Sequence, residues 1–402
     1  MTIEALMNSL GIEKIPPHWD EFYDDVMAEF DKKGTPLVDP AYYERLDAEY
    51  GAFPRFLETF KEAAAAIGKN EALSRYLALL AHAISDRSRA YNNLASFTPP
   101  KLPEGGHDLA YDMVTALATA SMIPHAYRVM TARGIPEEMV LRSIRSIDGS
   151  VGTYADRNGG HPGFHLIGWH QRTIDGNLYV VGSLQLEVFA TFGALATVYR
   201  NAAGESLALA EGITLHRDGY ALGAHGFLDE EGAWTANVTE TEDAYVGYPY
   251  DERGYVQKTP VTLKKSEWSV AIKHGDPIVS LHIPKGTDLR DESITETMVK
   301  IRAFCAEYFP DYHYRAFYCF SWMMDPQLDE MLGEHTNIVK FRRRYRPMTY
   351  KSAGHGVFGF IFQKPDMNFS LDELPENTTL ERKLKAHYKN GGAIYEMPAY
   401  FF

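Results

Sequence analysis

The sequence has little cysteine, no long apolar run and no excess of basic residues. Its 402 residues include only Cys305 and Cys319, which excludes a disulfide scaffold or a cysteine-based zinc site and suits the reducing cytoplasm. No stretch approaches the roughly 18 apolar residues of a membrane span. The start of the chain has no basic region of the kind that marks a secretory signal. A formal net charge of −14 argues against general nucleic-acid binding. We expect a cytoplasmic globular protein without membrane or nucleic-acid partners.

The first 150 residues carry the pattern of helices. Phe22, Val26 and Phe30 lie four residues apart, which predicts one apolar stripe on a helix over 20–33. Proline before an apolar run and glycine after it mark the starts and ends of further helices. These signals predict helices over 40–51, 54–68, 71–94, 108–134, with a break at Pro124, and 135–147.

After residue 150 the patterns become those of strands mixed with helices. Asp175-Gly176 predicts a hairpin turn, and residues 276–284 predict a buried strand. A helix follows, which Ser293 and Glu296 would open as a capping box. Two more strands are predicted over 336–347 and 355–363, and a polar insertion with short strands near 224–275. We therefore predict an α+β protein, with an all-helical domain over 1–150 and a mixed α/β domain over 151–402.

Three motifs, in order along the chain, resemble the signatures of a known family. They are "GWHQRTIDGNLYVVGSLQLEVF", "LHIPKGTDL" and "CFSWMMDPQLDEML" followed by "TNIVKF". The chain is similar to bacterial acyltransferase-domain proteins that pair a helical N-terminal N-acyltransferase domain with a C-terminal GNAT-like domain. The resemblance spans residues 140–345 and implies transfer of an acyl group from acyl-CoA, as co-substrate, to an amine of a small-molecule or peptide acceptor. It implies no metal.

The resemblance also implies that the turn after the central strand binds the coenzyme A pyrophosphate, through backbone N–H groups at the start of a helix. The residues that would do so are Ile283, Lys285, Gly286 and Thr287. The turn departs from the usual glycine-rich form because it carries Asp288, Asp291 and Glu292, which Lys285 and Arg290 only partly offset. Acidic side chains compete with a bound anion. A non-catalytic binding module that keeps the fold is therefore the alternative.

Two side chains are candidates for the catalytic base. His282 ends the predicted central strand, where an imidazole could deprotonate an amine because its pKa lies near working pH. The alternative is a histidine that holds the strand end by a hydrogen bond. Glu187 shares one strand face with Ser183 and Gln185, and Glu187 with Gln185 could orient an amine and remove its proton through water. The alternative is a solvated sheet face.

The segment "CFSWMMDP" places polar and aromatic side chains at a predicted strand end. Ser321 and Trp322 are candidates for lining the acyl or acceptor pocket. Asp325, followed by Pro326, is expected to start the next helix and so to be structural. Cys319 is expected to be a buried apolar side chain, since no Cys–His motif accompanies it.

Two further groups of residues leave alternatives open. On the predicted strand 336–347, Arg342, Arg344 and Arg346 would share a face, and we keep Arg344 as a candidate for an anionic substrate. The alternative is a solvated edge strand. His161, His165 and His170 suggest a metal-dependent hydrolase as a further alternative, although no metal-site spacing supports it.

Overall fold

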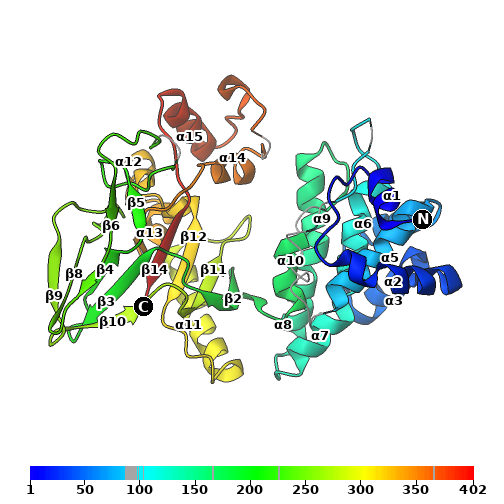
Figure 1. Ribbon diagram of the computed structural model, residues 1–402, viewed down its shortest axis with the longest axis horizontal. Helices are drawn as coiled ribbons and strands as arrows, with labels where there is room; N and C mark the ends of the chain where they lie inside the picture. Colours follow the sequence, from blue (N-terminus) through cyan, green and yellow to red (C-terminus); the bar gives the residue numbers. More distant parts are fainter. Residues whose placement is uncertain (87–96, 98, 103, 165–166, 225–226, 365–366) are drawn as a thin grey trace. The chain divides into compact units, whose positions relative to one another are not determined.

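The computed structural model describes residues 1–86, 97, 99–102, 104–164, 167–224, 227–364 and 367–402. The chain divides into two compact units, Met1–Val180 and Val181–Phe402, which we call the helical unit and the α/β unit (Figure 1). The α+β class predicted from the sequence is confirmed. Residue 150, near which the domain boundary was expected, lies inside the helix Ser146–Arg157, and one further helix, Ile167–Ile174, follows it within the helical unit.

The helical unit consists, over its described residues, of helices of seven to fifteen residues. They are α1 (Ile3–Ser9), α2 (Trp19–Lys33), α3 (Pro40–Tyr50), α4 (Leu57–Gly68), α5 (Glu71–Ser85), α6 (Leu109–Ala120), α7 (Ile123–Thr131), α8 (Glu137–Ile144), α9 (Ser146–Arg157) and α10 (Ile167–Ile174), with a 3₁₀ turn at Pro36–Val38.

Three predicted helix limits in this unit differ from the structure. α4 begins at Leu57 instead of Pro54, because the backbone amides of Arg55 and Phe56 donate to the buried Asp148 carboxylate. The α6–α7 break comes at Ser121–Met122, and Pro124 takes an early position in α7, where its missing N–H is tolerated. α5 ends at Ser85, and the rest of the predicted helix, residues 87–96, lies outside the described residues.

The predicted hairpin at Asp175-Gly176 is wrong. Residues before it form α10, and Gly176, with φ of 65°, begins the connection to β1 (Leu178–Val181). The tight turn between two paired strands lies instead at Gly182-Ser183, which joins β1 to β2 (Leu184–Thr191). Gly182 has φ of 60°, which favours glycine. A Cβ atom there would lie 2.5 Å from the Thr297 hydroxyl.

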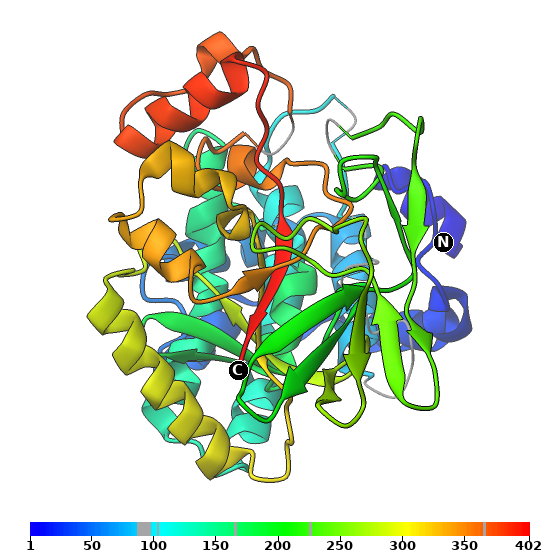
Figure 2. The ribbon, with the colours of Figure 1, turned by 90° about the vertical axis from the view of Figure 1, so that its left-hand side faces the viewer.

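The main sheet of the α/β unit has six strands in the order β1-β2-β11-β12-β14-β13. β11 (Pro277–His282) is antiparallel to β2 and parallel to β12 (Phe317–Ser321). β14 (Met397–Phe401) is antiparallel to both β12 and β13 (Arg346–Pro347). The crossover between the parallel strands is α11 (Asp291–Tyr308), which lies along one side of the sheet in Figure 2.

The two faces of this sheet are covered differently. On one face, the Arg302 guanidinium of α11 lies 4.6 Å from the centre of the Phe317 ring, and the apolar stripe of α11 is buried. On the other face, Ile278, Tyr318 and Tyr400 belong to the core of a long insertion between β2 and β11. The insertion holds β3 (Ala196–Asn201), β4 (Ser206–Ala210), β5 (Ile213–Leu215), β6 (Trp234–Ala236), β7 (Thr239–Glu240), β8 (Ala244–Gly247), β9 (Val261–Lys264) and β10 (Trp268–Ile272).

The C-terminal part of the chain departs most from the sequence-based expectation. The strands predicted over 336–347 and 355–363 are largely wrong, because α13 (Asn337–Arg342) and α14 (Gly356–Phe360) form there and only Arg346–Pro347, in β13, is a strand. The central strand β14 was not expected, since Pro398 in its interior argues against an inner strand. The remaining elements are a 3₁₀ turn at Trp322–Met324, α12 (Gln327–Leu332), a 3₁₀ turn at Leu371–Glu373 and α15 (Thr379–Lys389).

Replacing Gly182 with alanine tests the β1–β2 turn. We expect Gly182→Ala to lower the free energy of unfolding by about 2 kcal/mol or more, from the positive φ and the contact with Thr297 together. Gly212→Ala is the matched control, because Gly212 has φ of 70° and no atom lies within 4 Å of the added Cβ. Its free energy of unfolding should therefore fall by only about 1 kcal/mol. Urea unfolding of both variants would measure the difference, and equal losses would contradict the close packing at Gly182.

Candidate active site

The two central parallel strands part within the sheet. The register of β11 with β12 consists of Val279 opposite Phe317 and Ser280 opposite Tyr318. Beyond these pairs β11 stays paired with β2 as far as His282, and β12 stays paired with β14 as far as Ser321. Each strand therefore keeps its outer partner while the two separate from each other. An opening at the carboxyl end of parallel strands is the usual place for a ligand in a sheet of this kind.

Register also determines which side chains border this opening. Glu187, Ser280 and Tyr318 form one row across β2, β11 and β12, because cross-strand partners point to the same face. Two residues further along each strand toward the opening lie Gln185, His282 and Phe320, on that same face. It is the face opposite α11.

The two residues predicted as catalytic meet at this opening. Nε2 of His282 lies 2.9 Å from Oε2 of Glu187, and their side chains are 24% and 16% exposed. They are diagonal neighbours, since the partner of His282 in the register is Gln185. An ionised carboxylate only accepts hydrogen bonds, so Nε2 of a neutral imidazole donates to Glu187 and Nδ1 is its basic nitrogen.

The turn after β11 is closed by Thr287. Its backbone N–H and its hydroxyl both donate to the Pro284 carbonyl, at 3.2 and 2.7 Å, and the hydroxyl also lies 3.2 Å from the Ser183 carbonyl. Gly286 has φ of 82°, which the turn requires. This arrangement leaves Lys285 and Gly286 exposed at the tip of the turn, next to the start of α11.

Two of the three acidic residues of the turn, Asp288 and Asp291, are paired with arginines. Asp288 accepts from the backbone amide and the guanidinium of Arg290, and these hydrogen bonds lower the pKa of Asp288 to about 2. Asp291 accepts from Arg344, which also donates to the Thr295 hydroxyl at 2.7 Å. Arg290 and Arg344 therefore offset two of the three acidic side chains expected to oppose an anion at this turn.

The start of α11 corrects a sequence-based expectation. The helix begins at Asp291, with Arg290 as its N-cap, and no side chain caps it. Ser293 lies inside the first turn, so the predicted capping box with Glu296 is wrong. The acids Asp291 and Glu292 instead occupy the first turn, where the helix dipole favours negative charge.

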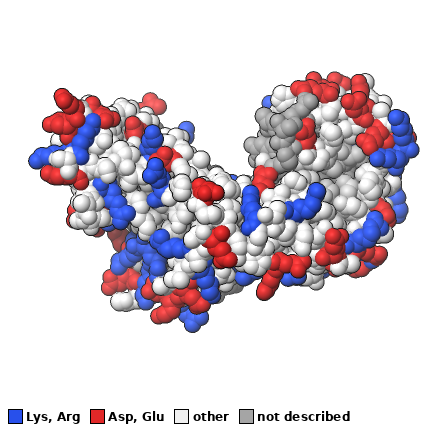
Figure 3. All heavy atoms as spheres, turned by 90° about the horizontal axis from the view of Figure 1, so that it is seen from below, with Lys and Arg blue, Asp and Glu red and all other residues white. Residues whose placement is uncertain are grey.

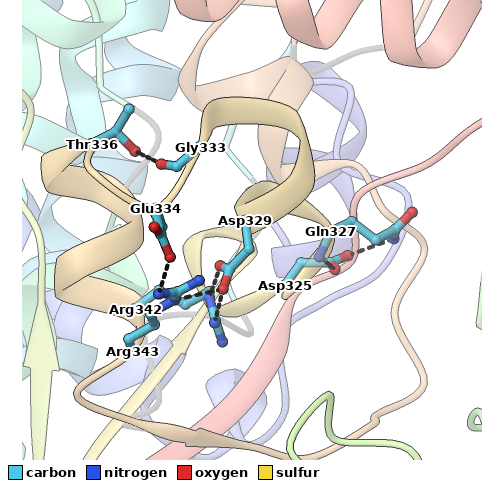
Figure 4. Close-up of polar contacts among 8 residues, drawn as sticks. All are labelled: Asp325, Gln327, Asp329, Gly333, Glu334, Thr336, Arg342 and Arg343. Atoms are coloured by element: carbon cyan, nitrogen blue, oxygen red, sulfur yellow. Dashed lines mark hydrogen bonds and ion pairs between the residues drawn. The ribbon is translucent and has the colours of Figure 1, made fainter.

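The arginine row predicted on one strand is also wrong, because Arg342 ends α13 and Arg344 follows that helix, while Arg346 begins β13. Arg342 donates through Nε and Nη2 to Asp329 of α12, at 2.5 and 2.6 Å, and Arg343 donates to the same carboxylate at 2.8 Å (Figure 4). Arg344 points to α11 instead. Of the row, Arg344 alone contacts the start of α11, beside the predicted phosphate turn.

The strand end of β12 shows one residue that sequence analysis missed. Ser321 accepts a hydrogen bond from the Met323 amide, and Trp322 is buried, so both predicted pocket residues take part in local structure. Phe320, by contrast, is 47% exposed on the face that carries His282. Alternation places Phe320 on the same face as Tyr318 but does not show that this position is exposed.

Asp325 has the structural role that its position predicted. It is buried, and its carboxylate accepts from the Gln327 amide at 2.9 Å (Figure 4). It also accepts from the Tyr395 amide at 2.8 Å, which ties α12 to the segment before β14. Burial raises the pKa of Asp325 to about 6, although these hydrogen bonds oppose the shift. The two cysteines are buried thiols.

The three histidines considered for a metal do not form a site among the described residues. His170 is buried and lies 2.8 Å from the Ser150 hydroxyl, and burial lowers its pKa to about 3. His161 stacks on His107 with ring centres 4.7 Å apart. His165 lies outside the described residues. Across the described part of the chain, no three potential ligands converge.

Charge is mixed on the visible surface of both units. Figure 3 shows acidic and basic side chains interspersed on each, without a continuous basic face there. Among the described helices, none is long and apolar enough to cross a membrane.

A mixed sheet whose central parallel strands part next to the start of the crossover helix defines a GNAT-like domain. Residues 178–401 match the family of GNAT-like C-terminal domains, and residues 53–176 match the N-acyltransferase N-terminal domain. The chain belongs to the family that joins these two domains, as the sequence motifs predicted. No curated protein matches the chain.

Solved structures show the same fold along the whole chain. A mutant acyltransferase in complex with octanoyl-CoA has a TM-score of 0.65 and 21% identity. An acyltransferase in complex with decanoyl-CoA and teicoplanin has a TM-score of 0.64 and 21% identity. Each alignment covers 100% of this chain and 99% of the other. The likeness establishes the fold.

The raised pKa of Asp325 predicts a specific pH dependence of stability. Because its folded-state pKa lies above the unfolded value, the bound proton stabilises the fold, and this contribution is lost as the pH rises through about 6. Between pH 5 and 7, wild type should lose about 1 kcal/mol of unfolding free energy relative to Asp325→Asn. Denaturant unfolding at several pH values would measure the difference.

Asp288→Asn is the control for this pH series. The pKa of Asp288 is lowered to about 2, so its contribution is present above about pH 4 and is lost only at lower pH. The difference between wild type and Asp288→Asn should therefore stay nearly constant from pH 5 to 7. A constant difference for Asp325→Asn as well would contradict a titrating buried carboxyl.

Proposed function

We propose that this protein transfers an acyl group from acyl-CoA to an amine of a small-molecule or peptide-like acceptor. The observation that carries the proposal is the contact of 2.9 Å between His282 and Glu187 at the opening between β11 and β12. A histidine that only held a strand end would need no carboxylate partner on the face beside that opening. The family of the chain and its fold support the same reaction.

The donor is proposed to enter through the opening. The pantetheine arm of coenzyme A carries amide groups, which can hydrogen-bond to the facing edges of strands that have separated. Its pyrophosphate would then lie at the turn of Ile283, Lys285, Gly286 and Thr287, near the positive end of the α11 dipole. Similar structures contain octanoyl-CoA or decanoyl-CoA, which supports an acyl-CoA donor here.

The proposed reaction is direct transfer. The acceptor amine attacks the thioester carbonyl carbon, and a new C–N bond forms while the carbonyl oxygen takes the negative charge. A backbone N–H near residues 281–283 would stabilise that oxygen. His282 takes the amine proton, directly or through water, and Glu187 orients the imidazole and stabilises its charge. The C–S bond then breaks, and the coenzyme A thiolate leaves and is protonated.

The acceptor is proposed to approach over β2, because Glu187 and Gln185 offer a carboxylate and an amide to an amine. Two of the similar structures contain the glycopeptide teicoplanin or 10C-teicoplanin, which supports a small or peptide-like acceptor. Two free thiols, both buried, suit a reducing compartment, and we expect the reaction to take place in the cytoplasm.

A non-catalytic binding module was the alternative, on account of the acidic turn. Because Asp288 and Asp291 are paired with arginines, their carboxylates compete less with a bound pyrophosphate. The contact of His282 with Glu187 favours catalysis over binding alone.

Substitution of His282 tests the proposed base. We expect His282→Ala to lower kcat/KM with acyl-CoA and an amine acceptor by about 100- to 10,000-fold, while the Kd for acyl-CoA changes less than about threefold. Glu187→Gln should lower kcat less and shift the pH profile, because it keeps the hydrogen bond but removes the charge. A thiol-release assay would measure turnover, and calorimetry would measure binding.

His335→Ala is the matched control, since the His335 side chain is 92% exposed on the α12–α13 connection. It should retain wild-type kinetics. Full activity in His282→Ala would exclude His282 as the base, and wild type that binds no coenzyme A thioester would exclude the acyltransferase function.

Lys285→Ala tests the phosphate turn. Loss of a cation beside the pyrophosphate should weaken coenzyme A binding by about three- to tenfold and reduce its salt dependence, without a change in kcat at saturating donor. Lys300→Ala, on the exposed side of α11 and paired with Glu296, is the control and should bind as wild type does. Equal affinities of all three proteins would place the pyrophosphate elsewhere.

A further inference from the structure

Phe320 is an exposed aromatic side chain in the interior of the main sheet. It lies on β12, whose neighbour β14 pairs with it through Pro398, so its backbone is held by regular strand structure. Nevertheless the residue is 47% exposed, while Tyr318 and Cys319 before it and Trp322 after it are buried. The ring of Tyr350 meets it edge-on, with centres 5.4 Å apart and planes at 76°. The two rings form an apolar surface on a rigid strand.

Register places this apolar surface beside the proposed reaction centre. Ser280 and Tyr318 are the last partners before β11 and β12 part, and His282 and Phe320 each lie two residues beyond them. His282 and Phe320 therefore flank the opening on the same face, one from each strand. A group bound at the mouth of the opening would therefore have His282 on one bordering strand and Phe320 on the other.

The two sides of the opening differ in polarity. Toward β2 lie the carboxylate of Glu187, the amide of Gln185 and the imidazole of His282, which suit an amine. Toward β12 lie Phe320 and Tyr350, which suit a hydrocarbon. The reaction brings these two kinds of group together, since the thioester carbonyl joins an acyl chain on one side to the attacking amine on the other.

We propose that Phe320, supported by Tyr350, binds the acyl chain, and that the protein therefore selects acyl-CoA donors with chains much longer than acetyl. This proposal rests on the acyl-CoA function proposed above and names the class of donor. An acetyl group carries a single methyl beyond its carbonyl, so it offers little apolar surface to the Phe320 ring. A longer chain removes its own methylenes and part of the ring from water.

Chain-length dependence of binding tests the proposal. Calorimetry would measure the Kd of coenzyme A, acetyl-, butyryl-, hexanoyl- and octanoyl-CoA for wild type, Phe320→Ala and Phe320→Leu. For wild type we expect the affinity to rise about two- to fourfold per added methylene, since burying one methylene contributes about that factor. Phe320→Ala should raise the Kd of octanoyl-CoA about tenfold and change the Kd of acetyl-CoA by less than about twofold. Phe320→Leu should recover most of the loss, because an apolar side chain is restored.

Phe360→Ala is the matched control, because Phe360 is also an exposed phenylalanine, at 65%, but lies on α14 outside the sheet. Phe360→Ala should show the same dependence of Kd on acyl-chain length as wild type. Thermal unfolding of each variant would show that the fold is intact. Octanoyl-CoA binding no tighter than acetyl-CoA in wild type, or an equal loss for all donors in Phe320→Ala, would overturn the proposal while coenzyme A binding itself upheld the acyltransferase function. Wild type that binds neither free coenzyme A nor any thioester would overturn both.

Discussion

The parting of β11 from β12 is the constraint on which the rest of the α/β unit depends. Two parallel strands can separate inside a sheet only if each is held by another neighbour. Here β2 holds β11 as far as His282, and β14 holds β12 as far as Ser321. β2 also carries a bulge, where Val188 and Phe189 lie opposite Val279, and such bulges bend a strand and increase its twist. The opening is therefore a consequence of how the outer strands are built.

The same constraint determines where the helices must be. α11 connects the two separated strands, so its first turn lies at the open end of the sheet. That turn is held from outside by Arg344, while Arg342 and Arg343 hold α12 through Asp329. Three consecutive arginines thus join α11, α12 and α13. This arrangement explains why a chain with a net charge of −14 concentrates basic residues after residue 335.

Sequence patterns predicted the helical half, β11 and α11 because each has a self-contained periodicity. They failed for α13 and β14, where tertiary contacts decide the structure. In α13, an arginine triplet looks like a solvated strand until Asp329 is placed beside it. In β14, Pro398 argues against an inner strand, yet its missing N–H is tolerated and its carbonyl accepts from the Met348 amide. Asp329 and Met348, the residues that make these contacts, both lie outside the sequence window of the element they stabilise.

The candidate site could be predicted only in part, because the contacts within it depend on residues that are distant in sequence. His282 and Glu187 could be identified because each lies at a recognisable place in a motif, but their contact of 2.9 Å depends on the register between strands that are 95 residues apart. Phe320 could not be identified, because alternation places it on a face but does not say whether that face is covered. The insertion covers Ile278, Tyr318 and Tyr400. Phe320 remains exposed because it lies beyond these residues, at the level where β11 and β12 have already separated. The polarity difference across the opening therefore arises from two separate features of the fold: the extent of the insertion on one face and the point at which the strands part.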